Sequence, residues 1–270
     1  MMLSEHNVWV LGAGFLGSAL AEECRQEGAR VLTIDPAAVA HLRGSAADMN
    51  LLRHALTRLV PDIVFCCTAT HGGTPEAYRE AYLAPAKNLC ALLRGTRVVF
   101  CSSSSVYAGR GGVVVTEDSP VCASSERAQV LLEAEQVVLN HAGVVARLAA
   151  LYGPGRCELI RRYMEALPTL PGEDCRRLNY LHRDDAVSAL LLLGTRCWLQ
   201  EGLFNVSGES FTKGGIYALL EATFGIEVEP ESSAPSKRGV TDMRVDCARL
   251  RALGWVPRND MLNFAREWKG

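Results

Sequence analysis

Residues 8–35 read VWVLGAGFLGSALAEECRQEGARVLTID and decide the fold of this chain. The four apolar residues 8–11 predict a buried strand, and the apolar residues after the glycines recur at the steps of an amphipathic helix. Gly28 can end that helix, because a helix C-cap often needs a positive φ that glycine adopts without strain. Residues 31–34 predict a second strand, with Asp35 at its end. The stretch is therefore a strand–helix–strand unit.

The glycines between the first strand and the helix have G-x-G-x-x-G spacing. Gly12 allows a tight turn, Gly14 lets a pyrophosphate approach the backbone, and Gly17 lets the helix pack closely on the strand. The helix N-terminus presents N–H groups to the phosphates, and Asp35 lies where a carboxylate accepts hydrogen bonds from a ribose. The unit predicts dinucleotide binding; the alternative is a glycine-rich turn without function. The residues predicted to contact the dinucleotide here are Gly12, Gly14, Phe15, Leu16, Gly17 and Asp35.

Asp35 also bears on the choice of cofactor. A carboxylate at this position repels a 2′-phosphate, so NAD is favoured over NADP. The next residue is Pro36 rather than an arginine that would attract the phosphate. Arg43 is close enough in sequence to leave NADP open as the less favoured cofactor.

The composition sets the limits of the protein class. A chain of 270 residues is long enough for one large α/β domain or for a large domain with a small lobe. Its net charge of −2 and the absence of a basic run give no indication of nucleic-acid binding. Polar residues precede the first short apolar strand and no apolar run is as long as a membrane span, so we expect no signal peptide, no membrane partner and a cytoplasmic location. The ten cysteines include no C-x-x-C pair and favour buried reduced thiols over a disulfide framework or a metal site.

Strands alternate with helices further along the chain. This alternation predicts a parallel sheet covered on both faces, with ligands bound at the carboxyl ends of its strands. Three loops follow predicted strands at that edge: residues 12–17, 68–74 and 102–107. In the second loop we expect Thr68 and Ala69 to contact the cofactor and His71 to contact a substrate, although His71 is also interpretable as a surface histidine. Pro85 is expected to kink or break the helix over residues 78–89.

Several segments, taken together and in order, resemble the extended short-chain dehydrogenase/reductases, the NAD-dependent epimerase/dehydratase family of nucleotide-sugar enzymes. These segments are GAGFLG (12–17), SSSSVYAG (102–109), TEDSP (116–120), RLAALYGPG (147–155), NYLHRDDAVSALLL (179–192), GLFNVSGE (202–209) and RVDCARLRALGWVP (244–257). The resemblance implies an α/β fold: a Rossmann-type doubly wound parallel sheet over residues 1–150, then a small C-terminal substrate lobe over residues 151–270. Residues 176–206 would partly return to the Rossmann core. It also implies an adenine contact for Asp48 and a homodimer formed through the helices around Tyr82 and Gln129.

The chain departs from this family at the catalytic pair. In the family a tyrosine exchanges a proton with the substrate hydroxyl, and a lysine four residues later lowers the pKa of that tyrosine. The alignment puts Arg127 and Leu131 in these two positions, and no tyrosine or lysine occurs between Gly109 and Glu135. A small shift in the alignment therefore cannot restore the pair.

Other residues are candidates for the missing chemistry. Ser103 aligns with the catalytic serine of the family, or it is only a turn-capping hydroxyl. Tyr107, usually structural in the family, is a candidate substitute acid. Arg127 does not release a proton at neutral pH, but it could bind a carboxylate or phosphate of the substrate.

The C-terminal lobe supplies the remaining substrate candidates. Tyr152 lies in the turn that opens the lobe. Arg156 belongs to a cluster with Arg161 and Arg162, which indicates either anion recognition or a solvated helix face. In the family the segment containing Asn179, Tyr180 and His182 lines the substrate cleft. Two further expectations are that Asp184 caps the following helix and that residues 229–239 form a loop or lid.

Two functions remain open from the sequence. The first is an NAD-dependent oxidoreductase or epimerase-like enzyme that acts on a nucleotide sugar or other hydroxylated small molecule by a non-standard mechanism. The second is a catalytically inactive dinucleotide-binding regulator or subunit. Loss of the tyrosine and lysine removes acid–base catalysis worth about 10²–10⁴ in rate. Hydride transfer to or from a positioned cofactor can still proceed.

Overall fold

The structure is a computed structural model, and it describes residues 3–37, 39–70, 72–165, 177–195, 202–225 and 242–268. The chain divides into two compact units. The first unit comprises Met1–Val106, Val121–Arg147 and Ala186–Phe204, and the second comprises Tyr107–Pro120, Leu148–Asp185 and Asn205–Gly270.

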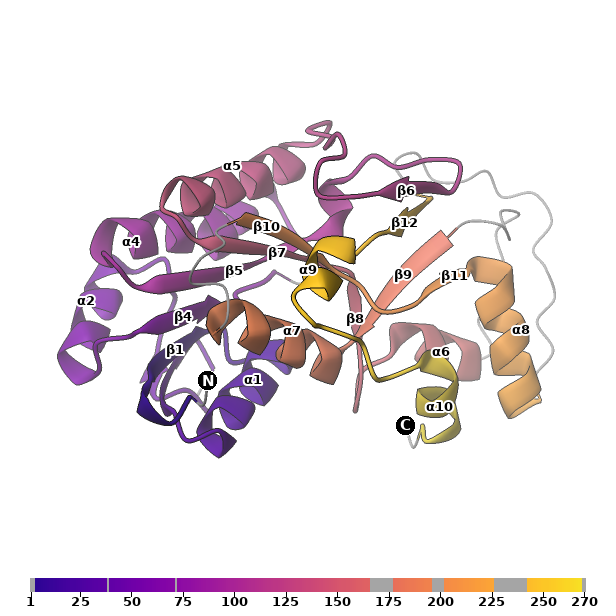
Figure 1. Cartoon of the computed structure of the whole chain (residues 1–270), viewed down its shortest axis with the longest axis horizontal. Helices are drawn as coiled ribbons and strands as arrows, with labels where there is room; N and C mark the ends of the chain where they lie inside the picture. The colour runs from indigo at the N-terminus through magenta and orange to yellow at the C-terminus, as the bar shows by residue number, and fades with distance from the viewer. Residues whose placement is uncertain are drawn as a thin grey trace. The chain divides into compact units, whose positions relative to one another are not determined.

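A seven-stranded sheet forms the centre of the first unit (Figure 1). In spatial order its strands are β10 (Gly202–Val206), β7 (Val144–Leu148), β5 (Arg97–Ser103), β4 (Ile63–Cys66), β1 (Asn7–Leu11), β2 (Arg30–Asp35) and β3 (Leu42–Arg43). The pairings from β3 through to β5 are parallel, and Val8 lies between Val31 and Ile63. The central position of β1 explains why residues 8–11 are all apolar, since both faces of the strand are covered. The predicted doubly wound α/β fold is confirmed.

Helices cover the two faces of this sheet. Figure 1 shows α2, α4 and α5 on one face and α1 and α7 on the other. The helices associated with the sheet are α1 (Phe15–Gln26), α2 (Met49–Arg58), α3 (Pro75–Tyr78), α4 (Ala84–Leu92), α5 (Glu126–Asn140) and α7 (Arg183–Thr195). Short 3₁₀ turns span Leu3–Glu5 and Ser104–Val106. The aromatic side chains of Trp9, Phe65 and Phe100 are 0% exposed, which places the centre of the core on β1, β4 and β5.

The helix that contains Pro85 is interrupted, as the sequence predicts. A π-helical turn over Arg79–Leu83 joins α3 to α4, and Pro85 lies in the first turn of α4. A proline is tolerated at this place because the first N–H groups of a helix have no partner within it. The interruption therefore precedes the proline.

The described part of the second unit contains two small sheets and four helices. Its strands are β8 (Ala150–Tyr152), β9 (Arg177–His182) and β11 (Ser210–Thr212) in one sheet, and β6 (Val113–Val115) and β12 (Met243–Val245) in the other. Its helices are α6 (Glu158–Met164), α8 (Lys213–Phe224), α9 (Ala248–Ala252) and α10 (Met261–Arg266). A buried apolar cluster joins β8, α6, α8 and α10 and consists of Tyr152, Cys157, Ile160, Tyr163, Ile216, Tyr217, Leu220, Met261 and Ala265.

One predicted cap is wrong. Helix α7 begins at Arg183, so Asp184 lies inside its first turn. The backbone N–H of Asp184 instead donates to Nδ1 of His182 at 3.2 Å. The imidazole immediately before the helix therefore supplies the capping acceptor.

Two sequence predictions concern residues that the structure does not describe. These are the substrate role of His71 and the loop or lid over residues 229–239. Across the described ranges, no helix combines the length and apolar character needed to cross a bilayer.

Candidate functional site

The glycine turn after β1 is shaped by close backbone packing. Gly12 has a φ of 84°, and a Cβ added to it would lie 2.7 Å from the carbonyl oxygen of Cys67. A Cβ added to Gly17 would overlap the carbonyl oxygen of Gly12. Around Gly14, by contrast, a Cβ would meet nothing within 4 Å. Positions 12 and 17 therefore require glycine because any larger side chain would clash with the backbone. The space around Gly14 is open.

Helix α1 begins directly from this turn. Gly14 is its N-cap and provides no side-chain hydrogen bond to the first N–H groups. A helix N-terminus of this kind suits an anion, because its N–H groups and the helix dipole favour negative charge. This geometry fits the pyrophosphate of a dinucleotide, and it includes the predicted Phe15 and Leu16 in the first turn of α1.

Asp35 ties the glycine turn to the end of β2. Its Oδ2 accepts the backbone N–H of Ala13 at 2.7 Å, and its Oδ1 accepts that of Ala37 at 2.7 Å. An ionised carboxylate has about four acceptor positions, so capacity remains for ribose hydroxyls. Arg43 is the strand partner of Asp35, and its Nε donates to the carbonyl oxygen of Pro36 at 3.0 Å.

A cavity of about 290 Å³ lies beside the turn. Its lining includes four predicted cofactor residues: Gly12, Asp35, Thr68 and Ala69. The remaining lining residues are Ile34, Pro36, Ser45, Ala46, Thr70, Ala77, Glu80, Ala81 and Pro85. Four cofactor residues predicted from distant parts of the sequence therefore meet at one cavity.

Thr70 is a residue of this cavity that the sequence analysis did not single out. Its Oγ1 is buried and has no hydrogen-bond partner among the described residues. A buried hydroxyl without a partner is costly unless a ligand or water satisfies it. The only sequence signal for Thr70 is its place in the loop after β4, which it shares with several other polar residues.

Asp48 does not line this cavity. It is the N-cap of α2, where its Oδ1 accepts the N–H groups of Asn50 at 2.8 Å and Leu51 at 3.3 Å. Its neighbours Ser45 and Ala46 do line the cavity. The adenine contact of Asp48 stays a prediction.

Arg127 and Leu131, the residues that the sequence alignment assigns to the family's tyrosine and lysine, lie on α5. Arg127 is exposed, and its guanidinium carbon lies 5.9 Å from the centroid of the Tyr78 ring. Leu131 is 3% exposed and packs in the core. Neither residue can exchange a proton at neutral pH, so α5 offers no acid–base pair at these positions.

A buried ionic network lies one turn further along α5. Glu135 accepts hydrogen bonds from Arg147 Nη2 at 2.6 Å and from Ser102 Oγ at 2.5 Å. The side chains of Glu135 and Arg147 are 3% and 5% exposed. The sequence analysis gave these residues no role, although a glutamate on an apolar helix face and an arginine in an apolar strand are recognisable signals.

Ser103 and Tyr107 occupy different environments. Ser103 is half-buried at the end of β5, and its Oγ accepts the N–H of Ser105 at 3.1 Å. That contact is the turn-capping bond expected of a serine here, and it leaves the hydroxyl proton of Ser103 able to donate. Tyr107 is 1% exposed, and its hydroxyl donates to Oδ1 of Asn205 at 2.8 Å. Burial makes Tyr107 a poor candidate for contact with a substrate.

Several predicted substrate residues of the second unit have structural contacts. Asn179 joins β9 to β12, because its Nδ2 donates to Met243 at 2.8 Å and its Oδ1 accepts from Val245 at 3.0 Å. Tyr152 is 3% exposed, and its ring lies against Tyr180 at 6.2 Å between centroids. Burial raises the pKa of Tyr152, which makes it a weak proton donor.

The arginine cluster divides into two parts. Arg161 and Arg162 both bind Glu158 on their own helix, and Arg161 also binds Glu165. These contacts hold the pKa of Glu158 well below its usual range. Arg156 is exposed in the turn before α6, where its backbone bridges to Gly153. The solvated-face interpretation therefore describes Arg161 and Arg162, while anion recognition by Arg156 stays a prediction.

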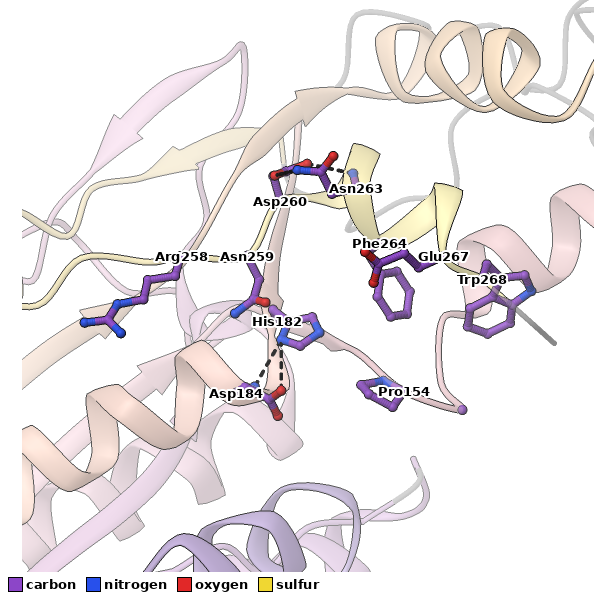
Figure 2. Close-up of a pocket in the computed structure, with 11 residues that line it drawn as sticks. Pro154, His182, Asp184, Arg258, Asn259, Asp260, Asn263, Phe264, Glu267 and Trp268 are labelled. Atoms are coloured by element: carbon purple, nitrogen blue, oxygen red, sulfur yellow. Dashed lines mark hydrogen bonds and ion pairs between the residues drawn. The ribbon is translucent and has the colours of Figure 1, made fainter.

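A cavity of about 540 Å³ lies in the second unit (Figure 2). It is lined by Pro154, Gly155, His182, Asp184, Arg258, Asn259, Asp260, Asn263, Phe264, Glu267 and Trp268. Of the predicted substrate candidates, only His182 lines it. Burial lowers the pKa of His182, so the imidazole is neutral and accepts at Nδ1. The cavity does not gather the substrate residues that the family resemblance implies.

Within the described ranges, no group of three or more histidine, cysteine, aspartate or glutamate residues is arranged to hold a metal ion.

Solved structures share this fold over nearly the whole chain. They include a putative epimerase from Burkholderia cenocepacia J2315, with 21% identity, a TM-score of 0.82, and coverage of 98% of this chain and 97% of the other. A UDP-glucose-4-epimerase from Stenotrophomonas maltophila, solved with NAD and formylated UDP-arabinopyranose, has 20% identity, a TM-score of 0.82 and 98% coverage of both chains. MoeE5, solved with UDP-glucuronic acid and NAD, has 23% identity, a TM-score of 0.78 and 96% coverage of both chains. At these identities the likeness shows the fold alone.

No significant match is found among curated proteins. The model of the NAD dependent epimerase/dehydratase family matches residues 8–206, which is most of the chain. The match includes the glycine turn, the serine segment after β5 and the strand that ends at Val206. This chain belongs to the NAD dependent epimerase/dehydratase family.

Proposed function

We propose that this chain binds NAD(H) at the glycine turn of its first unit. The observation that carries the proposal is the cavity where Gly12, Asp35 and Thr68 meet beside the uncapped N-terminus of α1. The unpaired Oγ1 of Thr70 in the same cavity supports a polar ligand. Three solved relatives of the fold were crystallised with NAD, which agrees with this choice of cofactor.

NAD(H) is favoured over NADP(H) because of Asp35. Its carboxylate would oppose a 2′-phosphate, whereas it can accept hydrogen bonds from ribose hydroxyls. Arg43 is the neighbouring positive charge, with its Nε on the carbonyl oxygen of Pro36. The preference therefore depends on the balance between Asp35 and Arg43.

The proposed activity is oxidoreductase or epimerase-like chemistry on a nucleotide sugar or another hydroxylated small molecule. Bound NAD would supply the hydride acceptor. Ser103 is the candidate to hold the reacting hydroxyl, because it is half-buried at the carboxyl end of β5 and can donate its proton. Two solved relatives contain UDP-sugars, which supports this substrate class.

A specific observation favours the alternative, an inactive dinucleotide-binding regulator or subunit. The sequence alignment assigns Arg127 and Leu131 to the catalytic pair, and Leu131 is buried. The proton step therefore lacks its usual residues, while the cofactor turn is intact. The two proposals differ in turnover, not in NAD binding.

The first experiment titrates the purified protein with NADH, NAD⁺, NADPH and NADP⁺, followed by nicotinamide fluorescence and thermal shift. Binding of NADH with weaker binding of NADPH is expected. Asp35→Asn should weaken NADH binding by about ten- to a hundredfold, the size expected for hydrogen bonds to a charged group. Arg43→Ala is the matched control and should leave NADH binding unchanged. Failure of all four dinucleotides to bind would overturn the proposal.

The second experiment separates the enzyme from the inactive binder. Wild-type protein with NAD⁺ is incubated with UDP-glucose or UDP-glucuronic acid, and NADH formation and sugar-nucleotide products are measured. Turnover that falls about a hundredfold in Ser103→Ala, and not in the exposed neighbour Ser105→Ala, supports the enzyme. Tight NADH binding without turnover of either sugar nucleotide favours the regulator.

We also propose a homodimer formed through the helices around Tyr82 and Gln129, which are the π-helical turn with α4 and the helix α5. Within one chain, ion pairs already join this stretch to α5: Lys87 Nζ of α4 lies 2.8 Å from Glu133, and Arg79 Nη2 of the π-helical turn lies 2.8 Å from Glu126. Light scattering should give twice the mass of the chain, and a monomer at micromolar concentration would contradict the proposal.

A further inference from the structure

Two cysteines meet at the carboxyl edge of the parallel sheet. Cys67 directly follows β4, and Cys101 lies near the end of β5. The parallel register pairs Cys66 with Phe100, so the next residues on each strand are Cys67 and Cys101. Their Sγ atoms are 3.6 Å apart. Their side chains therefore project to the same face of the sheet.

This geometry is close to what a disulfide needs. Neighbouring strands lie about 4.8 Å apart, which falls within the Cα separations that disulfides span. The two sulfur atoms would have to approach by about 1.5 Å to reach a bond of about 2.05 Å. Cys67 is partly exposed and Cys101 is 7% exposed, so a small oxidant can reach the pair from the Cys67 side.

The neighbouring cysteines have different surroundings. Cys66 projects to the opposite face of β4, where its Sγ lies 3.4 Å from Oγ1 of Thr68. Cys90 has its Sγ 3.8 Å from the carbonyl oxygen of Val137. Both therefore serve as internal comparisons for the pair.

We propose that Cys67 and Cys101 form an oxidisable dithiol, a modification site that a peroxide converts to a disulfide. One thiolate attacks a peroxide oxygen, which breaks the O–O bond and gives a sulfenic acid and water. The second sulfur then attacks the sulfenic sulfur and displaces its hydroxyl as a second water. Two electrons pass from the sulfur atoms to the peroxide, and two thiols with one hydrogen peroxide yield one disulfide and two waters.

The Cys67–Cys101 pair should react slowly with peroxide. The hydrogen bond to Cys101, together with burial, raises the pKa of the Cys67 thiol well above its usual value. Since the thiolate is the nucleophile, the raised pKa makes Cys67 slow to react at neutral pH. The dithiol is therefore a target of sustained peroxide rather than a fast catalytic thiol.

The modification would act on the cofactor turn, a consequence that rests on the proposed NAD(H) binding. The backbone of Cys67 packs on Gly12, and its N–H donates to the carbonyl oxygen of Leu11 at 2.8 Å. The next residues, Thr68, Ala69 and Thr70, line the cavity. A covalent tie between β4 and β5 would shift this loop. We expect it to weaken NADH binding by at least about tenfold, within the usual range for coupling between sites.

The test maps the disulfide in the full-length protein. Protein treated with hydrogen peroxide is alkylated, digested with trypsin without reductant and analysed by mass spectrometry. Cleavage after Arg58, Arg79, Arg97 and Arg110 isolates Cys67 in peptide 59–79 and Cys101 in peptide 98–110. The expected product is these two peptides joined with the loss of two hydrogen atoms, and dithiothreitol should separate them.

Variants assign the bond, because peptide 59–79 also contains Cys66. Cys67→Ser and Cys101→Ser should each abolish the joined peptide, whereas Cys66→Ala and Cys90→Ser should retain it. A joined peptide that survives in Cys67→Ser, or its absence from wild type while other thiols are oxidised, would overturn the proposal. A joined peptide with unchanged NADH affinity would overturn the coupling. Failure of the reduced protein to bind NADH would instead remove the proposed function and leave the dithiol standing.

Discussion

The glycine turn and the start of α5 lie in the same unit, and they preserve the family's features to different degrees. In the turn, Cβ atoms at Gly12 and Gly17 would collide with backbone oxygens of Cys67 and Gly12. On α5, the two catalytic positions hold an exposed arginine, Arg127, and a buried leucine, Leu131. The glycine turn keeps the family's pattern, whereas the two residues that the alignment assigns to the catalytic pair cannot exchange a proton at neutral pH.

The difference between the two regions separates residues needed for packing from residues needed for the reaction. The outer glycines are held by contacts within the protein's own backbone, so they are needed for packing whatever the reaction is. The tyrosine and lysine of the family are needed only by the reaction, because an exposed or apolar side chain can replace them without disturbing the fold. An intact turn therefore supports the fold and cofactor binding, but it gives no information on whether the protein turns over a substrate.

The largest expected effect on NADH binding comes from Gly17→Ala. The new methyl group would overlap the carbonyl oxygen of Gly12 and lie 3.2 Å from Cγ1 of Val10. Because the overlap is with backbone, α1 must move, at a cost of about 1–3 kcal/mol or more. We expect NADH binding to be lost and the Tm to fall, as measured by fluorescence titration and calorimetry.

Gly14→Ala is the matched change in the same turn. A Cβ there meets nothing within 4 Å, so the Tm should remain near that of the wild type. NADH binding should still weaken, since this glycine is where the pyrophosphate approaches the backbone. Equal losses of Tm in the two variants would contradict the distinction between packing and ligand approach.

Much of this turn could be predicted from sequence. The spacing of Gly12, Gly14 and Gly17 between a buried strand and an amphipathic helix, with Asp35 after the next strand, depends only on local patterns. The cavity confirms that Gly12 and Asp35 come together. Thr70 could not be singled out, because its unpaired hydroxyl results from how a loop folds and not from a residue pattern.

The wrong prediction that Asp184 caps α7 also comes from local packing that a residue pattern does not show. Asp184 is a preferred capping residue, so the sequence favoured it. Helix α7 begins at Arg183, two residues earlier than a cap at Asp184 would allow, and His182 takes the position before the helix. A difference of two residues at a boundary is common, and here it turns a predicted cap into a first-turn carboxylate.

Among the effects on stability alone, the largest should come from breaking the buried network of α5. Glu135→Gln removes the charge that pairs with Arg147 Nη2 at 2.6 Å, and leaves a buried guanidinium without its counter-ion. Loss of one partner of a buried pair costs about 3–5 kcal/mol. Urea unfolding should show that decrease in the free energy of unfolding.

Glu133→Gln is the control two residues away on the same helix. Glu133 and its partner Lys87 are both 53% exposed, so the change should cost less than about 1 kcal/mol. Comparable losses for the two variants would mean that the Glu135 network is not a closed buried pair. A large difference would show that α5 keeps a structural charge one turn beyond the catalytic residues that it has lost.

Leu131→Lys asks whether the lysine position could still hold a charge. Leu131 is 3% exposed, so an ammonium group there loses water without a counter-charge and should destabilise the protein by about 3 kcal/mol. Leu131→Met keeps the volume and should cost less than about 1.5 kcal/mol. If Leu131→Lys were as stable as wild type in urea, the position would open onto space that can accept an ammonium, and the contrast with the glycine turn would weaken.

Arg127→Ala should have the smallest effect on stability. The guanidinium is exposed over the Tyr78 ring at 5.9 Å, a contact worth about 0.5–1 kcal/mol at an exposed site, and it has no part in the glycine turn. NADH affinity should therefore be unchanged. Affinity for UDP-glucose should fall if Arg127 binds a substrate phosphate, and the exposed Arg94→Ala controls for the loss of one positive charge. Equal affinity for UDP-glucose in both variants would leave Arg127 as a surface residue. The catalytic position would then have lost its proton chemistry without gaining a substrate contact.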